Sequence, residues 1–242
     1  MNADRLLVTD ADNTLWETDA VYARAQLDLL GRVEQSFHFT SDSPDRLAFV
    51  RRIDQDLARW HPLGLRYPPQ LLVHAIAARG AGTDTSAQLM GANPSEYDPR
   101  VNKIAVEFLA QVSDEVPILR PGVSNTLPRL AASGVNIVVF TEGDPNRCER
   151  LLVAHDLKRC ILSITAARKT VESYATMLRA NRSAGDPIMV GDQLDRDIIM
   201  AQSAGFRGVY FPGSFEPEWG RTVQATPDYV ISSFSEILEI VH

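Results

Sequence analysis

Acidic side chains, one hydroxyl group and one ammonium group follow the ends of short apolar runs in this chain. The first run, Arg5–Thr9, leads into Asp10 and Asp12, which are separated by a single residue. Residues two apart in an extended chain point to the same side, so we expect both carboxylates in one place. The chemistry-bearing positions of this kind are Asp10, Asp12, Thr141, Glu142, Lys169, Asp192 and Asp197.

Carboxylates brought close together need a cation. Two of them about 4 Å apart repel by about 4 kcal/mol at an effective dielectric constant near 20. Such a cluster persists with a cation in its middle or with protons taken up. Oxygen ligands combined with a phosphate suit Mg²⁺, and phosphoryl transfer also needs a nucleophile, an acid or base, and a cation near the phosphoryl oxygens. The residues therefore predict a Mg²⁺ site that handles phosphate groups.

Lysine is rare among the cations of this chain. Of 24 Lys+Arg residues only Lys103, Lys158 and Lys169 are lysines. Arg168 stands beside Lys169 and is the alternative cation for the site. A slim ammonium group fits between a carboxylate and a phosphate where a planar guanidinium does not, so we assign the position to Lys169.

The elements that must position these groups alternate between strand and helix. Most of the apolar runs are continuous, which is typical of parallel strands covered on both faces, and amphipathic segments separate them. This alternation predicts a doubly wound, Rossmann-like α/β sheet, in which ligands bind at the carboxyl ends of the strands. The expected strands are Arg5–Thr9, Val135–Thr141, Ile161–Thr165, Pro187–Gly191, Arg207–Phe211 and Asp228–Ser232. The expected helices of this part are Val123–Ala132, Asn146–His155, Lys169–Asn181 and Asp195–Ala204.

One connection is far too long for a simple crossover. The 125 residues between Thr9 and Val135 exceed the few tens that a βαβ crossover needs. Their pattern is helical, so we expect an all-helical domain at 17–113, inserted into an α/β core of 1–16 and 114–242. Its expected helices are Asp19–Val33, Pro44–Trp60, Pro68–Ala78 and Pro99–Val112.

Composition excludes several classes of protein. A net charge of −7 and a pI of about 5.2 argue against binding nucleic acid or an anionic membrane. The apolar runs are too short to span a bilayer, and the first residues lack the pattern of a signal peptide. Two cysteines, Cys148 and Cys160, make no disulfide framework, and we expect free thiols. We therefore expect a cytoplasmic monomer or homodimer.

The ordered motifs Asp10-x-Asp12-x-Thr14, Thr141, Lys169 and Gly191-Asp192-x-x-x-x-Asp197 resemble those of the haloacid dehalogenase (HAD) superfamily. The resemblance covers the α/β part. Three positions depart from the family pattern without removing a reactive group. Asn13 stands where glycine is common, and Thr9 stands where an aromatic or aliphatic residue is common. Val171 occupies the second position after Lys169, where the family often has proline.

The resemblance implies a role for each matching position. Asp10 would be the nucleophile that forms an aspartyl-phosphate. Asp12 would protonate the leaving alcohol and then activate water. Mg²⁺ would be held by Asp10, the backbone carbonyl of Asp12, and Asp192. Thr141 would bind a phosphoryl oxygen, and we assign the neighbouring Glu142 to substrate binding. The simpler alternative for Thr141 is that it caps the N-terminus of the following helix.

Two roles concern charge around the nucleophile. Lys169 would neutralise charge on Asp10 and the phosphate. Asp197 would lie near the metal or hold Lys169, and Asp195 is a rival for that place that could instead cap the following helix.

The resemblance also gives the insert a function, that of a mobile C1-type cap that closes over the site and carries specificity. The 27 residues between Thr141 and Lys169, and the 22 between Lys169 and Asp192, leave no room for a second cap. Trp16 and Trp60 are expected to pack inside, although Trp16 could line the site, and Phe211–Ser214 could form its rim. The residues of the insert that could read a substrate are Arg24, His38, Arg51, Arg52, His61, Arg66, Tyr67 and His74.

The expected activity is Mg²⁺-dependent hydrolysis of a small phosphorylated metabolite, such as a nucleotide or sugar phosphate. The acid at position 12 favours phosphate esters over organohalides, because a halide leaves without a proton. The alternatives are a dehalogenase, a phosphonatase, which would need a further lysine in the insert, and a non-catalytic phospho-aspartate switch.

Overall fold

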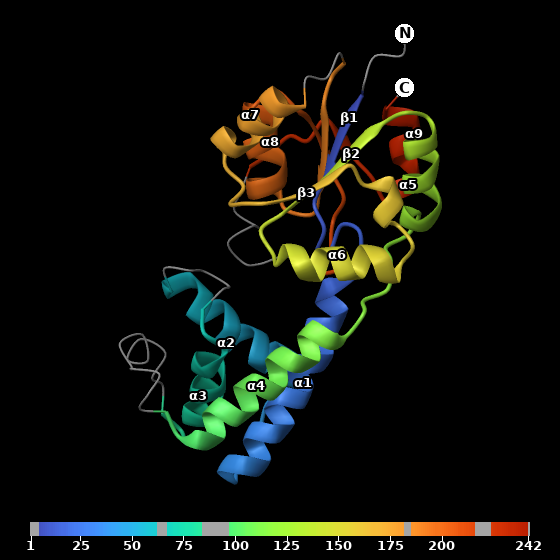
Figure 1. The fold of residues 1–242 in the computed structure, drawn as a ribbon. Helices are drawn as coiled ribbons and strands as arrows, with labels where there is room; N and C mark the ends of the chain where they lie inside the picture. Colours follow the sequence, from blue (N-terminus) through green and yellow to red (C-terminus); the bar gives the residue numbers. More distant parts are fainter. Residues whose placement is uncertain (1–4, 62–66, 84–96, 182–184, 216–223, 242) are drawn as a thin grey trace. The chain divides into compact units, whose positions relative to one another are not determined.

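The structure, a computed structural model, describes residues 5–61, 67–83, 97–181, 185–215 and 224–241 (Figure 1). The chain forms two compact units. One comprises Met1–Asp19 with Val116–His242, and the other comprises Ala20–Glu115.

The first unit is built on a parallel sheet, which confirms the predicted fold class. Its strand order is β3-β2-β1-β4-β5-β6, and every neighbouring pair is parallel. Each expected strand corresponds to one observed strand. The bounds are β1 (Leu6–Thr9), β2 (Asn136–Thr141), β3 (Ser163–Ala166), β4 (Ile188–Gly191), β5 (Arg207–Tyr210) and β6 (Tyr229–Val230).

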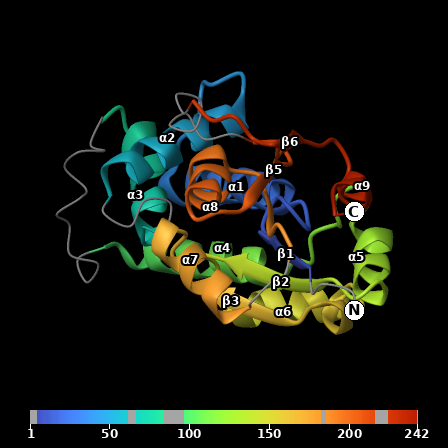
Figure 2. The same ribbon diagram turned by 90° about the horizontal axis from the view of Figure 1, so that it is seen from above.

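Helices cover both faces of this sheet (Figures 1 and 2). Leu7 packs with residues of α5 (Val123–Ala132), α6 (Pro145–Ala154) and α9 (Ile237–Ile240). Its neighbour Val8 points to the other face and packs with residues of α7 (Val171–Ala180) and α8 (Met200–Ser203). Burial on both faces explains why the strands are continuous apolar runs.

Strand β1 lies at the point where the winding of the sheet reverses. After β1 the chain adds β2 and β3 on one side, and it then crosses to β4, β5 and β6 on the other side. In open α/β sheets the crevice for ligands forms at the carboxyl ends of the strands at such a switch point. The residues that follow β1 and β4 therefore lie where a site is expected.

Two helix starts next to the candidate site differ from the prediction. Helix α7 begins at Val171 rather than at Lys169, because Thr170 is extended and caps it together with Ser173. The segment after β4 begins with a π-helical turn, η5 (Leu194–Ile199), before α8. Asp195 lies inside η5, whose N-cap is Gln193, so the alternative that Asp195 caps this helix is wrong.

The second unit contains four helices among its described residues, in the places where helices were predicted. They are α1 (Thr18–Phe37), α2 (Arg46–Trp60), α3 (Pro69–Gly80) and α4 (Pro99–Asp114). Asp45 caps α2, so that helix begins two residues after the predicted Pro44. Within the described ranges, no helix is both long and apolar enough to cross a membrane.

Candidate active site

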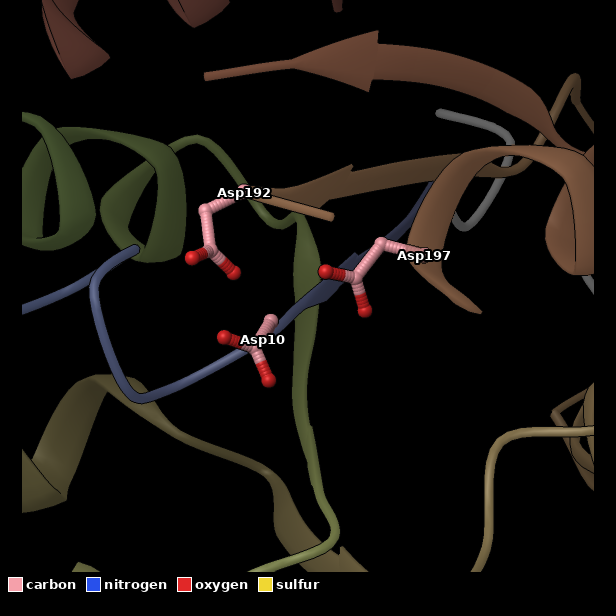
Figure 3. Close-up of side chains that lie close together, drawn as sticks. All are labelled: Asp10, Asp192 and Asp197. Atoms are coloured by element: carbon pink, nitrogen blue, oxygen red, sulfur yellow. The ribbon is translucent and has the colours of Figure 1, made fainter. Parts of the chain in front are cut away.

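Three buried carboxylates meet at the carboxyl ends of β1 and β4 (Figure 3). Asp10 follows β1, Asp192 follows β4, and Asp197 lies on η5. Each offers one carboxylate oxygen, and these oxygens all lie within 4.8 Å of one another. The π-helical turn brings Asp197 against Gly191, where any side-chain atom would collide with the aspartate. Glycine at position 191 is therefore a requirement of the cluster.

Lys169 supplies the cation of this cluster. Its ammonium group donates to Asp10 and, over 2.5 Å, to Asp197 Oδ1. Burial lowers the pKa of Lys169, but attraction to Asp10 and Asp197 outweighs burial, and the pKa lies well above its usual value. Arg168 is exposed whereas Lys169 is buried, so the structure places the lysine at the carboxylates.

One positive charge does not compensate three carboxylates. Burial raises the pKa of Asp10 from 3.8 to about 7, even though Lys169 lowers it. Burial and then repulsion from Asp10 and Asp197 raise the pKa of Asp192 well above 3.8. Asp192 Oδ1 is buried and has no hydrogen-bond partner among the described residues. An unpartnered buried oxygen in an all-oxygen donor set fits a divalent cation such as Mg²⁺, which Asp10 and Asp192 would hold with Asp197 beside them.

Asp12 lies outside that group of carboxylates. Its Oδ1 accepts hydrogen bonds from Thr18 Oγ1 (2.6 Å) and Trp16 Nε1 (3.1 Å), and Arg147 Nη1 lies 3.4 Å away. Its Oδ2 faces Gly143, where a Cβ atom would lie only 3.3 Å from it. One oxygen of Asp12 is thus fixed by three donors, and the other faces the glycine that follows β2.

Trp16 combines two of the roles considered for it. It is fully buried in the core, as expected, and its indole also donates to Asp12. The indole bond and the contribution of Thr18 were not anticipated from the sequence. Trp60, which was expected to pack inside, is 65% exposed, so that expectation is wrong.

Thr141 is buried at the end of β2, and its Oγ1 accepts a hydrogen bond of 2.8 Å from the Gly143 N–H. Asp144 caps α6 through a 2.9 Å bond from the Asn146 N–H. The alternative that Thr141 caps this helix is therefore wrong. A hydroxyl group that accepts at its oxygen can still donate its own proton, and the site at Gly143 that Oγ1 faces is also faced by Asp12 Oδ2.

Glu142 is engaged on both carboxylate oxygens. Its Oε1 accepts from the backbone N–H of Lys169 (2.8 Å), and its Oε2 accepts from Arg196 Nη1 (2.7 Å). The structure thus brings Glu142 to the site through the main chain of Lys169.

Arg120 holds together two loops beside the site, and the sequence did not single it out among the 21 arginines. Its guanidinium donates to the backbone carbonyls of Asn13 (2.6 Å), Phe211 (3.1 Å) and Pro212 (2.7 Å). It also lies over the Phe211 ring, 3.6 Å from the centroid, and pairs with Glu17. Arg120 thereby ties the loop after β1 to the predicted rim Phe211–Ser214.

Asn13 departs from the family pattern, and its backbone explains why it is tolerated. It has φ of 57°, a left-handed conformation that asparagine adopts more readily than most residues. Its side-chain oxygen accepts a 2.7 Å hydrogen bond from the Asp19 N–H. Asparagine therefore closes the loop with a bond that glycine cannot form.

The insert residues considered as substrate readers have varied surroundings within their own unit. Arg24 pairs with Glu115, Tyr67 donates to the Asp54 carboxylate, and the His74 ring packs edge-on against Tyr97. His38 and Arg52 are exposed, Arg51 and His61 are half-buried, and Arg66 lies outside the described residues. Their proposed role in recognition stays a prediction.

Comparisons with known proteins agree with the geometry of the α/β unit. The sequence pattern of the HAD-hydrolase-like family matches residues 165–237. A phosphoglycolate phosphatase of Vibrio parahaemolyticus is 26% identical over 143 residues, which are 56% of this chain and 61% of that protein. The matched region thus spans about three fifths of the length of this curated relative.

Solved structures share the fold over the whole chain. One is described as a predicted phosphoglycolate phosphatase of Haemophilus somnus, with a TM-score of 0.67, 16% identity and full coverage of both chains. Another is a HAD-hydrolase-type protein of Bacillus subtilis bound to magnesium, with a TM-score of 0.67, 16% identity and 99% coverage of both chains. These structures show that the chain has the fold of the HAD-type proteins it resembles, and the family match places residues 165–237 in the part that carries Lys169, Asp192 and Asp197.

Proposed function

We propose that this protein is a Mg²⁺-dependent phosphatase that hydrolyses a small phosphate monoester through an aspartyl-phosphate on Asp10. The observation that carries the proposal is the pairing of two differently placed carboxylates after β1. Asp10 lies in the buried cluster against Lys169, whereas Asp12 is held outside it by neutral and cationic donors. A nucleophile next to a separate acid is the arrangement that phosphate ester cleavage requires.

In the first step an Asp10 carboxylate oxygen attacks phosphorus, and the bond from phosphorus to the ester oxygen breaks. Asp12 donates a proton to that oxygen, so the alcohol leaves neutral. Lys169 and the Thr141 hydroxyl hold the phosphoryl oxygens and offset their charge. Mg²⁺ held by Asp10 and Asp192 would supply further charge neutralisation to the phosphoryl group.

In the second step Asp12, now a carboxylate, removes a proton from water as the water oxygen attacks the phosphorus of the aspartyl-phosphate. The bond from phosphorus to the Asp10 oxygen breaks, which releases phosphate and restores both side chains. Thr14 Oγ1 donates to Asp10 Oδ2 over 3.1 Å and so orients the nucleophile between turnovers.

We further propose that the helical unit is the cap that selects the substrate, and that the substrate is a small cytoplasmic metabolite. Nucleotide and sugar phosphates are candidates from the sequence, and 2-phosphoglycolate joins them because the curated relative is a phosphoglycolate phosphatase.

The test is phosphate release by the purified protein from a panel of phosphorylated metabolites, with Mg²⁺ and with EDTA. We expect release from one class of substrate, its loss in EDTA, and its loss in Asp10→Asn. Turnover that survives either treatment would refute the mechanism. Stable phosphorylation of Asp10 without turnover would indicate a switch, and halide release from haloacids would indicate a dehalogenase.

A further inference from the structure

A carboxylate outside the proposed catalytic set connects three of the segments that form the site. Glu142 follows β2, Lys169 precedes α7, and Arg196 lies on η5. Glu142 Oε1 accepts the backbone N–H of Lys169 (2.8 Å), while Oε2 accepts Arg196 Nη1 (2.7 Å).

The position of Lys169 explains why it needs such an anchor. It precedes the first helical residue of α7, so its N–H belongs to the extended segment before the helix rather than to helical hydrogen bonding. From this backbone position the side chain of Lys169 must place its ammonium group between Asp10 and Asp197. A hydrogen bond to a carboxylate is among the stronger anchors available to a backbone N–H.

Arg196 in turn holds the carboxylate in place. Its Nη2 donates to Gln193 Oε1 on the same turn, and its backbone carbonyl accepts from the Tyr174 hydroxyl of α7 (3.3 Å). The side chain of Glu142 is only 14% exposed and that of Arg196 is 33% exposed, so solvent weakens this ion pair less than a surface pair.

We propose that Glu142 and Arg196 are positioning residues that fix the backbone of Lys169 and thereby the place of its ammonium group in phosphoryl transfer. The proposal rests on the proposed function for its catalytic consequence, while its structural part stands independently. Glu142 then acts through Lys169 and contacts no substrate. A displacement of about 1 Å at a catalytic group costs about 10²-fold in rate, so removal of this anchor is expected to lower kcat far more than it changes KM.

The structural part can be tested without turnover, because the chain has only three lysines. Protein labelled with ¹⁵N-lysine gives three backbone amide signals, and Lys169→Arg identifies the one from residue 169. In Glu142→Ala this signal should move upfield and exchange with solvent at least about tenfold faster. Glu142→Gln keeps an acceptor and should retain much of the protection, and Arg196→Ala should fall between them. An unchanged Lys169 signal in Glu142→Ala would overturn the proposal.

The catalytic part is tested by a double-mutant cycle. Glu142→Ala should lower kcat by about 10²-fold in the natural background and by less than about twofold when Lys169 is already alanine. Glu172→Ala is the matched control, since its pair with Arg179 is close to Lys169 in sequence but highly exposed, and its kcat should stay at the natural value. Equal losses with and without Lys169 would refute action through the lysine. If the unaltered protein releases no phosphate from any substrate, the proposed function fails, and the amide signals still decide the positioning.

Discussion

Replacing Asp192 by asparagine is expected to stabilise the metal-free protein while abolishing its response to Mg²⁺. The Asp192 carboxylate is 8% exposed, and its pKa is raised by burial and by Asp10 and Asp197. A carboxyl group with a higher pKa in the folded than in the unfolded state favours folding at low pH, and this contribution is lost as the pH rises. Each unit by which folding raises the pKa of a carboxyl group is worth about 1.4 kcal/mol. Because pH 7 lies about three units above the ordinary pKa of 3.8, the burial of a charged Asp192 lowers the free energy of unfolding at pH 7 by at most about 4 kcal/mol.

The asparagine amide removes the charge but still buries polar atoms, at a cost of about 1–3 kcal/mol. We therefore expect Asp192→Asn to raise the free energy of unfolding in EDTA at pH 7, by at most about 2 kcal/mol. The gain should disappear below about pH 4, where the carboxyl group is protonated in both states. Urea unfolding between pH 4 and pH 8 measures this difference.

Mg²⁺ should reverse the ranking. At a concentration about a hundredfold above its Kd, the ion adds about 2.7 kcal/mol to the stability of the natural protein and nothing to the variant, which exceeds the advantage of the variant in EDTA. Asp186→Asn is the control, because that side chain is 80% exposed, and its substitution should change stability by less than about 0.5 kcal/mol. The reasoning is refuted if Asp192→Asn is the less stable protein in EDTA at pH 7, or if Mg²⁺ stabilises both proteins equally.

Four further expectations follow from the same geometry. Asp12→Asn should lower kcat by about 10²–10⁴-fold for alkyl phosphates, and much less for an aryl phosphate whose leaving group needs no proton, measured by phosphate release. Arg120→Ala should cost about 3 kcal/mol in urea unfolding, because it leaves three carbonyls without their shared donor, and Arg120→Lys should recover only part of this loss. Mg²⁺ affinity, measured by calorimetry, should fall at least about tenfold for each pH unit below 7, since the ion must displace at least the proton of Asp10. Trp16→Phe should keep most of the packing but lower kcat, because Asp12 loses its indole donor, and the melting temperature should change little.

The sequence predicted the sheet well because its strands carry their own signal. The central strands β1, β2 and β4 are apolar runs buried on both faces, so local composition is sufficient to find them. The start of α7 is set by the capping box of Thr170 and Ser173, a local signal that the prediction overlooked. The π-helical turn η5 was missed because it depends on the packing of Asp197 against Gly191. Local helix signals carry no information about such contacts.

The candidate site likewise contains residues that the sequence could predict and one that it could not. Asp10, Asp192, Asp197 and Lys169 could be found from spacing, since each lies at or near the end of an element on one edge of the sheet. Arg120 could not, because its hydrogen-bond acceptors are backbone carbonyls, and a carbonyl leaves no trace in the residue types around it.

The use of lysine and arginine at this site follows from the shape of the two cations. Arg120 must reach three carbonyls on two loops, and a planar guanidinium with five donors can do so from one place. Arg196 likewise spans Glu142 and Gln193. Lys169 has the opposite task, since its group must fit between Asp10 and Asp197 and, in the proposed mechanism, still leave room for a phosphate. A guanidinium at position 169 would push the two carboxylates apart, so Lys169→Arg should keep the charge and still lose activity.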